Sequence, residues 1–239
     1  MVRAAWLSAL LALATSASAQ QVDTRPTTST PSSNLTNIPA PPPGASFWAQ
    51  AEKVRTVDIP QWAKDAGHNG SAAYTATVGA DGKLVALNLR VSSRSEAIDA
   101  AVKARAETLS YRPATDKDGN PVAGPVNIRM GYARYDKDSP GGGIDTYTCG
   151  DLVREYDWFN AANDGLFTGF APRTAFHTLG ARWRIEQGQP LDEASMDADI
   201  EARMDMWPML LEKCRNHPGR LLLGEIEYPE TYRRLVDSY

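Results

Sequence analysis

The chain has 239 residues, of which 25 are lysine or arginine and 29 are aspartate or glutamate, giving a formal net charge of −4. Hydrophobic residues make up 42% and charged residues 23%, as in soluble globular proteins, which argues against full-length disorder. The length accommodates one large domain or two small ones. The mild acidity lacks the basic footprint of nucleic-acid-binding proteins, so no nucleic acid partner is predicted.

The first 19 residues are typical of a secretory signal peptide. Arg3 supplies a positive charge, an apolar run extends from Ala4 to Ala14, and a site of small residues ends at Ala19. The run has about 11 residues, whereas a membrane-spanning helix needs about 20. We therefore expect cleavage between Ala19 and Gln20, no membrane span in the mature protein, and a location in the periplasm. An uncleaved membrane anchor is the alternative.

The two cysteines, Cys149 and Cys214, lie far apart and belong to no CxxC motif or Cys/His cluster. This argues against a zinc site and against thioredoxin-like redox chemistry, and no metal or cofactor is predicted. In an oxidising compartment two cysteines usually form a disulfide. We expect a bridge between Cys149 and Cys214, with two free buried cysteines as the alternative.

Two segments are predicted to connect domains rather than to pack. Residues 20–46 are rich in serine, threonine, asparagine and proline, which is typical of a disordered tether. Residues 138–145 contain three consecutive glycines, which is typical of an interdomain linker.

Between these segments, residues 47–137 predict a small domain that mixes strands and a helix. An Asp-Gly turn joins two strand-like runs, 72–78 and 83–91, and this pattern predicts a β-hairpin. Apolar residues at helical spacing predict a helix over 95–109, with Ser95 as its N-cap and Ser93 as the alternative. Alternation over 126–132 predicts a half-buried strand, and residues 60–66 predict a short helix.

Residues 146–239 predict a mainly helical domain with a C-terminal tail. One helix carries apolar residues from Cys149 to Phe159 and has Thr148 as its cap. A second helix is expected over 174–184, and the tail, 227–239, is expected to add one short helix.

A third helix is predicted to start at Asp192, its N-cap. Its apolar stripe, which we expect to lie in the core, consists of Met196, Ile200, Met204, Trp207, Leu211 and Cys214. Pro208 lies inside this run and is predicted to kink the helix or to split it in two.

The predicted helical domain is strongly acidic, since residues 138–239 hold 18 acidic and 10 basic side chains. Six of the acids crowd the third helix: Asp192, Glu193, Asp197, Asp199, Glu201 and Asp205. Mutual repulsion is expected to raise some of their pKa values, and a conformational switch at acidic pH is a hypothesis that this cluster motivates.

The first domain resembles the TonB C-terminal domain family over about 80 residues. The matching residues are Ile59-Pro60, Ala63, Ala66, Gly70, Asp81-Gly82-Lys83, Ser92-Ser93, Asp99-Ala100-Ala101-Val102, Tyr111-Arg112-Pro113-Ala114 and Gly119-Asn120-Pro121-Val122. The resemblance implies a small βαβ-type domain that binds an envelope or outer-membrane protein by its surface or by adding a strand to an open sheet edge.

Energy transducers of the TonB family keep an uncleaved membrane helix and a long proline-rich segment. This chain has a cleavable leader and a short tether, which favours a protein-binding role. An energy transducer acting in transport with outer-membrane receptors is the alternative. Sequencing the mature N-terminus separates the two hypotheses.

The second domain resembles the periplasmic HdeA-type acid-stress chaperones. The resemblance rests on the helix opening Tyr147-Thr148-Cys149-Gly150-Asp151-Leu152 and on Pro208, Leu211, Cys214 and Pro218 at the end of the domain. It implies one disulfide that pins a small helical bundle and a role in envelope stress or as a chaperone. The stretch between the cysteines is longer here than in that family.

No catalytic residue is predicted, because the sequence contains none of the common nucleophile, zinc-protease, phosphate-loop or dinucleotide motifs. The three histidines, His68, His177 and His217, share no motif and are expected to have surface or capping roles. The chain is thus predicted to be a non-enzyme of the α+β class. An enzyme would need a pocket in which His177 meets carboxylates.

Overall fold

The computed structural model describes residues 45–46, 48–164 and 169–239. The predicted signal peptide, its cleavage site between Ala19 and Gln20, and all of the predicted tether except its last two residues lie outside this part of the chain. Among the described residues no helix has the length and apolar character needed to cross a bilayer.

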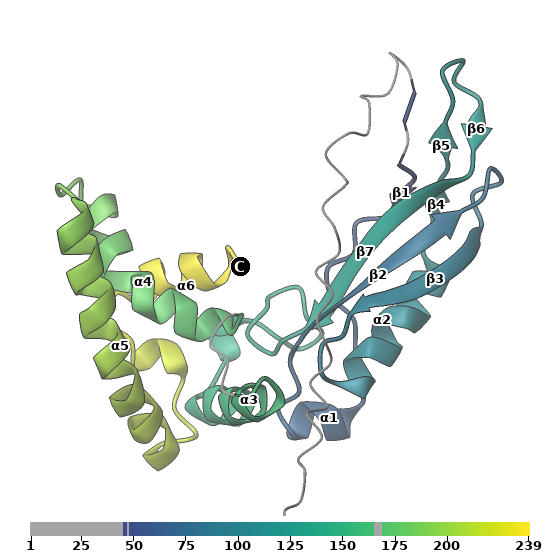
Figure 1. Ribbon diagram of the computed structural model, residues 1–239. Helices are drawn as coiled ribbons and strands as arrows, with labels where there is room; N and C mark the ends of the chain where they lie inside the picture. Colours follow the sequence, from purple (N-terminus) through teal and green to yellow (C-terminus); the bar gives the residue numbers. More distant parts are fainter. Residues whose placement is uncertain (1–44, 47, 165–168) are drawn as a thin grey trace, which may run out of the picture. The chain divides into compact units, whose positions relative to one another are not determined.

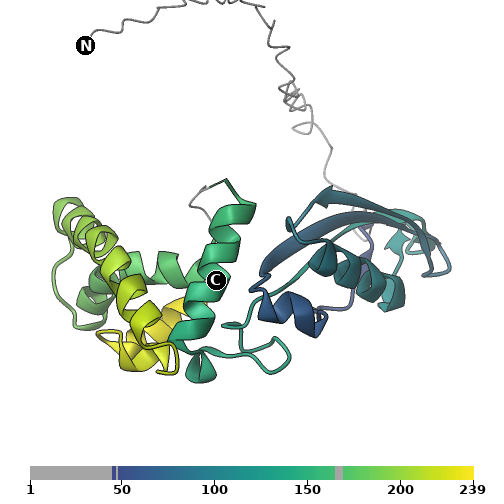
Figure 2. The same cartoon turned by 90° about the horizontal axis from the view of Figure 1, so that it is seen from below.

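A three-stranded antiparallel sheet forms the centre of the first half of the described chain. Its strands are β2 (Gly70–Val78), β3 (Leu84–Val91) and β7 (Gly124–Tyr132), in the order β3-β2-β7. The helix α2 (Glu96–Thr108) follows one face of the sheet (Figures 1 and 2). The predicted hairpin, helix and final strand are therefore confirmed within a few residues at each end.

Alternation along the strands explains why this face is buried. Every second residue of β7, namely Val126, Ile128, Met130 and Tyr132, is at most 5% exposed, as a strand with one covered face requires. These side chains pack with Ile98 and Val102 of α2 in one apolar core. The predicted N-cap of α2 is also confirmed, because the Ser95 hydroxyl accepts a hydrogen bond from the Ile98 amide.

Short elements surround this sheet. The helix α1 (Gln61–Asp65) confirms the predicted short helix. Two small strand pairs complete the region: β1 (Gln50–Ala51) with β4 (Tyr111–Arg112), and β5 (Ala114–Thr115) with β6 (Pro121–Val122).

Residues 138–145 form consecutive tight turns. Gly142 donates its amide hydrogen to the Ser139 carbonyl at 2.8 Å, and Gly143 donates to the Arg134 carbonyl at 2.9 Å. A Cβ atom on Gly142 would lie 2.5 Å from a backbone oxygen of Asp136, so the turn closes only with glycine there. The chain then enters a 3₁₀ turn, η2 (Ile144–Thr146), in which Ile144 is buried.

The remaining chain is helical. It contains α3 (Cys149–Ala162), α4 (Ala171–Glu186), α5 (Glu193–Asn216), the 3₁₀ turn η3 (Leu222–Gly224) and α6 (Pro229–Val236). The predicted caps are confirmed, since Thr148 and Asp192 each accept a hydrogen bond from the third residue of their helix. The short helix expected in the tail is α6. It is tied to α4 by the Tyr232 hydroxyl, which donates to the Pro172 carbonyl at 2.9 Å.

The helix α5 is continuous through Pro208, so a split into two helices, one of the two outcomes predicted for this proline, does not occur. Pro208 lies on the exposed side of the helix. The buried side chains of Trp207, Leu211 and Cys214 hold the segments on both sides of the proline in one core, and this packing maintains the helix where a hydrogen bond is lost.

The predicted apolar stripe of α5 is buried only in its second half. Trp207 is 1% exposed and Cys214 is fully buried, whereas Met196 is 36% exposed and Met204 is 47% exposed. The expectation that the whole stripe lies in the core is therefore wrong for its first half. The disulfide between Cys149 and Cys214 is present and joins the start of α3 to the end of α5. The fold is mixed α and β with one disulfide.

Candidate interaction site

The strand β3 is an edge of the sheet, because its only strand partner among the described residues is β2 (Figure 1). Three large apolar side chains on β3 are exposed: Val85 by 70%, Leu89 by 47% and Val91 by 59%. An edge strand that also exposes apolar side chains presents both backbone hydrogen-bonding groups and apolar surface to another chain.

The opposite edge of the sheet is partly covered. The Val57 amide donates to the Gly131 carbonyl at 2.9 Å, and the Gly131 amide donates to the Arg55 carbonyl at 3.0 Å. Near the other end of β7, the Ala49 amide donates to the Pro125 carbonyl at 3.0 Å. The segment that precedes α1 thus occupies part of β7's outer edge, and β3 presents the more accessible edge.

The middle of β3 is regular. The pairing of β2 with β3 shifts register between Ala73 and Tyr74 and again between Thr77 and Val78. Between these two irregularities, residues 86–89 pair one-to-one with residues 74–77. Bulges increase local twist and limit edge pairing, so the regular stretch of β3 is the part best suited to receive another strand.

The start of β3 is fixed by the predicted Asp-Gly turn. Gly82 has a φ angle of +78°, which favours glycine. The Asp81 carboxylate accepts a hydrogen bond from the Lys83 amide at 3.0 Å, and the Gly79 amide donates to the Lys83 carbonyl at 2.8 Å. These contacts set the register with which the chain enters β3.

The end of β3 is fixed by Asp99 in the first turn of α2. Its carboxylate accepts hydrogen bonds from the Ser93 amide at 2.8 Å, from the Ser93 hydroxyl at 2.7 Å and from the Ser92 hydroxyl at 2.6 Å. Three donors from the segment after β3 therefore converge on one side chain of α2. This arrangement orients the edge strand relative to the helix.

Replacing Asp99 with alanine is expected to lower the free energy of unfolding by about 1–3 kcal/mol, because the backbone amide of the buried Ser93 loses its acceptor. Chemical denaturation followed by circular dichroism measures this loss. The matched control is Asp118→Ala, which removes an exposed carboxylate that pairs with the adjacent Lys117. Equal stability of the two variants would contradict the role assigned to Asp99.

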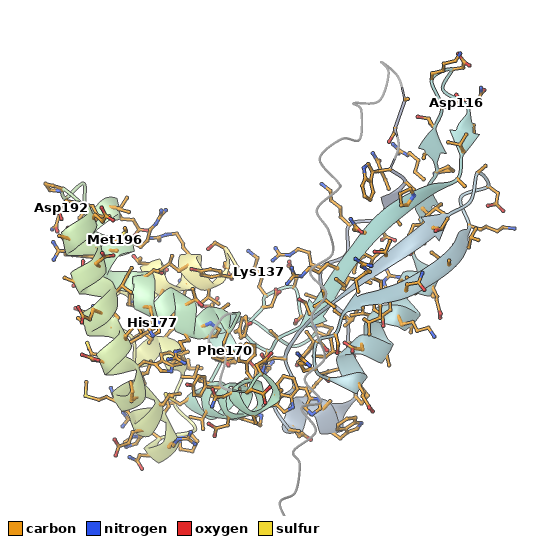
Figure 3. All side chains as sticks on the ribbon, in the orientation of Figure 1. Asp116, Lys137, Phe170, His177, Asp192 and Met196 are labelled. Atoms are coloured by element: carbon orange, nitrogen blue, oxygen red, sulfur yellow. A yellow bond between two sulfur atoms is a disulfide. The ribbon has the colours of Figure 1, made fainter. Side chains whose placement is uncertain are left out.

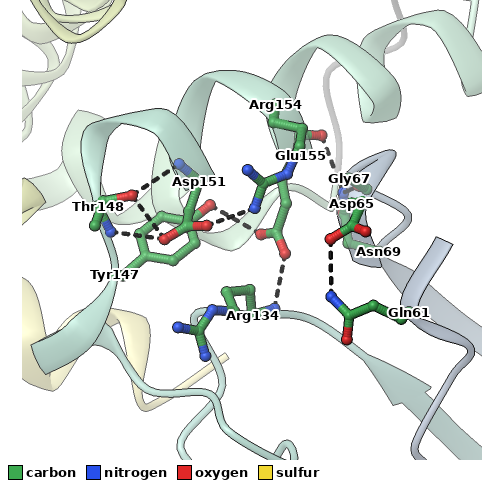
Figure 4. Close-up of polar contacts among 10 residues, drawn as sticks. All are labelled: Gln61, Asp65, Gly67, Asn69, Arg134, Tyr147, Thr148, Asp151, Arg154 and Glu155. Carbon is green, nitrogen blue, oxygen red and sulfur yellow. Dashed lines mark hydrogen bonds and ion pairs between the residues drawn. The ribbon is translucent and has the colours of Figure 1, made fainter. Parts of the chain in front are cut away.

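A second polar cluster is built around Glu155 of α3 (Figure 4). The carboxyl group of Glu155 accepts hydrogen bonds from the Tyr147 hydroxyl and from the Arg134 amide, both at 2.8 Å. Its backbone carbonyl accepts a hydrogen bond from the side-chain amide of Asn69 at 3.0 Å. Glu155 is thus a bridging residue between α3, the segment after β7 and the loop after α1.

Burial raises the pKa of Glu155 to about 8, because removal from water disfavours the charged form. The same cause raises the pKa of Tyr132 to about 12 and raises the pKa of Tyr147 well above its ordinary value. Glu155 is 2% exposed. Its geometry therefore gives it a structural role, which the sequence did not reveal.

The three histidines differ in their surroundings. His217 is the C-cap of α5, as a capping role predicts. His68 lies half-buried, stacks on Trp158 with ring centroids 4.7 Å apart, and is 2.7 Å from the Ser95 hydroxyl through Nδ1. His177 is 6% exposed, so its expected surface or capping role is wrong. Burial, together with the nearby Arg173 cation, lowers the pKa of His177.

The acidic cluster of α5 also differs from its expectation at one position. The pKa of Asp192 is lowered rather than raised, because its carboxylate accepts a hydrogen bond from the Ser195 amide at 2.7 Å. Asp199 pairs with Arg184 of α4 at 2.7 Å. The Asp192 carboxylate therefore caps its own helix, and the Asp199 carboxylate pairs with a cation of the neighbouring helix. Neither carboxylate is subject only to repulsion from nearby acids.

A cleft of about 880 Å³ opens beside β7. Arg55, Arg129 and Asp136 are among its lining residues. His177 does not line the cleft. His177 and Asp136 therefore do not meet in this cleft.

The chain was also compared with known proteins. No protein-family model matches it, and no curated protein matches it.

Proposed function

We propose that this chain is a non-enzymatic protein-binding protein of the cell envelope that pairs β3 with an extended segment of a partner. The single observation that carries the proposal is the edge strand β3, which has one strand partner among the described residues and exposes Val85, Leu89 and Val91. In strand addition, main-chain hydrogen bonds supply affinity, and side chains on alternate positions supply specificity.

Both contributions favour binding at β3. The regular stretch, residues 86–89, offers backbone groups with strand geometry and little need for rearrangement. Full burial of a valine or leucine side chain contributes about 1.5–3 kcal/mol relative to exposure. Even partial burial of Val85 and Leu89 by a partner would offset part of the entropy lost on association.

The sequence supports the same assignment. The residues that resemble the TonB C-terminal domain family span the hairpin, α2 and the segment before β7. Strand addition at the sheet edge, with an envelope or outer-membrane protein as partner, is what that resemblance implies. The HdeA-like residues and the predicted leader favour the same location, the periplasm.

The proposal predicts that Val85→Lys and Leu89→Lys weaken partner binding by about tenfold or more, because a charge on an edge strand opposes strand pairing. The partner is unidentified, so the probe is a set of peptides selected from a random display library on the immobilised full chain. Hydrogen exchange of the chain with a selected peptide is expected to protect amides within residues 84–91.

The matched control is Val122→Lys on β6, which places the same charge at an exposed valine outside the three-stranded sheet. Its affinity for the selected peptides is expected to stay within about twofold of the wild type. Selected peptides that leave β3 unprotected, or that bind the two β3 variants and the Val122 variant equally, would overturn the proposal.

A further inference from the structure

The first half of α5 carries two adjacent rows of side chains that the fold leaves exposed. The first is a methionine strip formed by Met196, Ile200 and Met204, which are four residues apart and so lie on one face of the helix. Met196 is 36% and Met204 47% exposed, and Ile200 is half-buried. Figure 3 shows Met196 and Asp192 at the same end of α5.

The second is an acidic row, and it follows the same spacing. Its members are Glu193, Asp197, Glu201 and Asp205, all exposed. Each of the first three lies three residues before a member of the methionine strip, which makes them neighbours on the helix surface. Within the described part of the chain no cation pairs with any of the four, whereas Asp199 of the same helix pairs with Arg184.

The other flank of the methionine strip is occupied by the bundle itself. Asp199 pairs with Arg184 of α4, and the guanidinium of Arg203 lies over the Phe176 ring at 5.9 Å. Arg203 also pairs with Glu227 at 2.7 Å. The strip is therefore bounded on one side by α4 and on the other by the exposed carboxylates of the acidic row.

We infer that this surface binds a basic amphipathic segment of a partner protein, with apolar side chains on the methionine strip and lysine or arginine beside the acidic row. Methionine side chains are flexible and polarisable, which suits them to partners of varied apolar shape. An unpaired row of carboxylates selects cationic partners and disfavours anionic ones. Charge complementarity therefore identifies the occupant, and the inference is independent of the edge strand β3.

The test uses fluorescence anisotropy with the full chain and three labelled probe peptides. The first is an amphipathic helical peptide of leucine and lysine, the second has the same composition in scrambled order, and the third replaces lysine with glutamate. Only the first is expected to bind at micromolar concentration, and added salt is expected to weaken its binding because ion pairs at the surface are screened.

Variants of α5 locate the binding surface. The double variant Met196→Gln/Met204→Gln and the double variant Asp197→Lys/Glu201→Lys are each expected to raise the Kd by about tenfold. For a single-site comparison, Met204→Gln is matched with Met206→Gln, which changes a methionine of similar exposure, 39%, turned to the other side of the helix. Met206→Gln is expected to leave the Kd within about twofold.

Equal binding of the ordered and scrambled peptides would overturn the inference, because charge alone would then explain it. An equal effect of Met204→Gln and Met206→Gln would overturn it too, as would no binding of the first peptide. If the wild type self-associates and Met196→Gln/Met204→Gln is monomeric, the strip is instead an interface between copies of this chain, and the proposed partner is wrong.

Discussion

Replacing both cysteines, in Cys149→Ala/Cys214→Ala, is expected to lower the free energy of unfolding by about 2–5 kcal/mol. The bridge joins residues with a sequence separation of 65, and chain-entropy arithmetic for a loop of this length gives about 4 kcal/mol. The loss is a large part of the stability of a small domain. Denaturant unfolding of the variant and the wild type, both oxidised, measures it.

The wild type in a reductant is the matched control. Its stability is expected to fall toward that of the double variant, whereas the variant should not respond to the reductant. Hydrogen exchange is expected to show larger losses of protection in α3 and α5, which the bridge joins, than in β2 and β7. An oxidised wild type that is no more stable than the variant would contradict the stabilising role of the bridge.

The contribution of Glu155 to stability is expected to fall as the pH rises from about 5 to about 8, and Glu155→Gln is expected to remove this contribution. In the folded protein the pKa of Glu155 is raised from its ordinary 4.5 to about 8. Between these values the folded state retains a proton that the unfolded state releases. The stabilisation is therefore complete below the unfolded pKa and is lost as the pH approaches 8.

The slope that Glu155 contributes is at most about 1.4 kcal/mol per pH unit, the free-energy equivalent of one unit of pKa. Denaturant unfolding across this pH range, compared between the wild type and Glu155→Gln, isolates the contribution of Glu155, because the two proteins have all other titratable groups in common. Glutamine keeps the shape of the side chain and an acceptor for the Arg134 amide. The control is Glu107→Gln, an exposed position on α2. If Glu155→Gln retains the full slope, another group is responsible.

Several elements could be predicted because their signals are local. The Asp-Gly turn and the alternation of β7 give the β2–β3 hairpin and the buried face of the sheet. The capping residues Ser95, Thr148 and Asp192 mark the starts of three helices. In each case the residues that determine the structure lie within one turn or one strand of one another.

The interaction sites were only partly predictable. An open sheet edge is expected from the family resemblance, but which strand is open depends on the segment before α1. Among the described residues this segment pairs with part of β7, and no strand pairs with the outer edge of β3. The apolar spacing of α5 predicts a stripe of apolar side chains. It does not indicate how far along α5 the neighbouring helices α3 and α4 extend. Met196 and Met204 are exposed for that reason, while Trp207 on the same stripe is buried.

By itself the sequence determined the order of the elements, their caps and the two cysteines available for a bridge, because these depend on backbone preference and on residue type. Only the tertiary structure decided which groups are removed from water. Glu155 and His177 belong to amphipathic helices like many exposed residues, and their burial follows from the segments that pack over them from elsewhere in the chain. Desolvation then sets their pKa shifts, since the energy of a charge depends on its surroundings in space rather than on its neighbours in sequence.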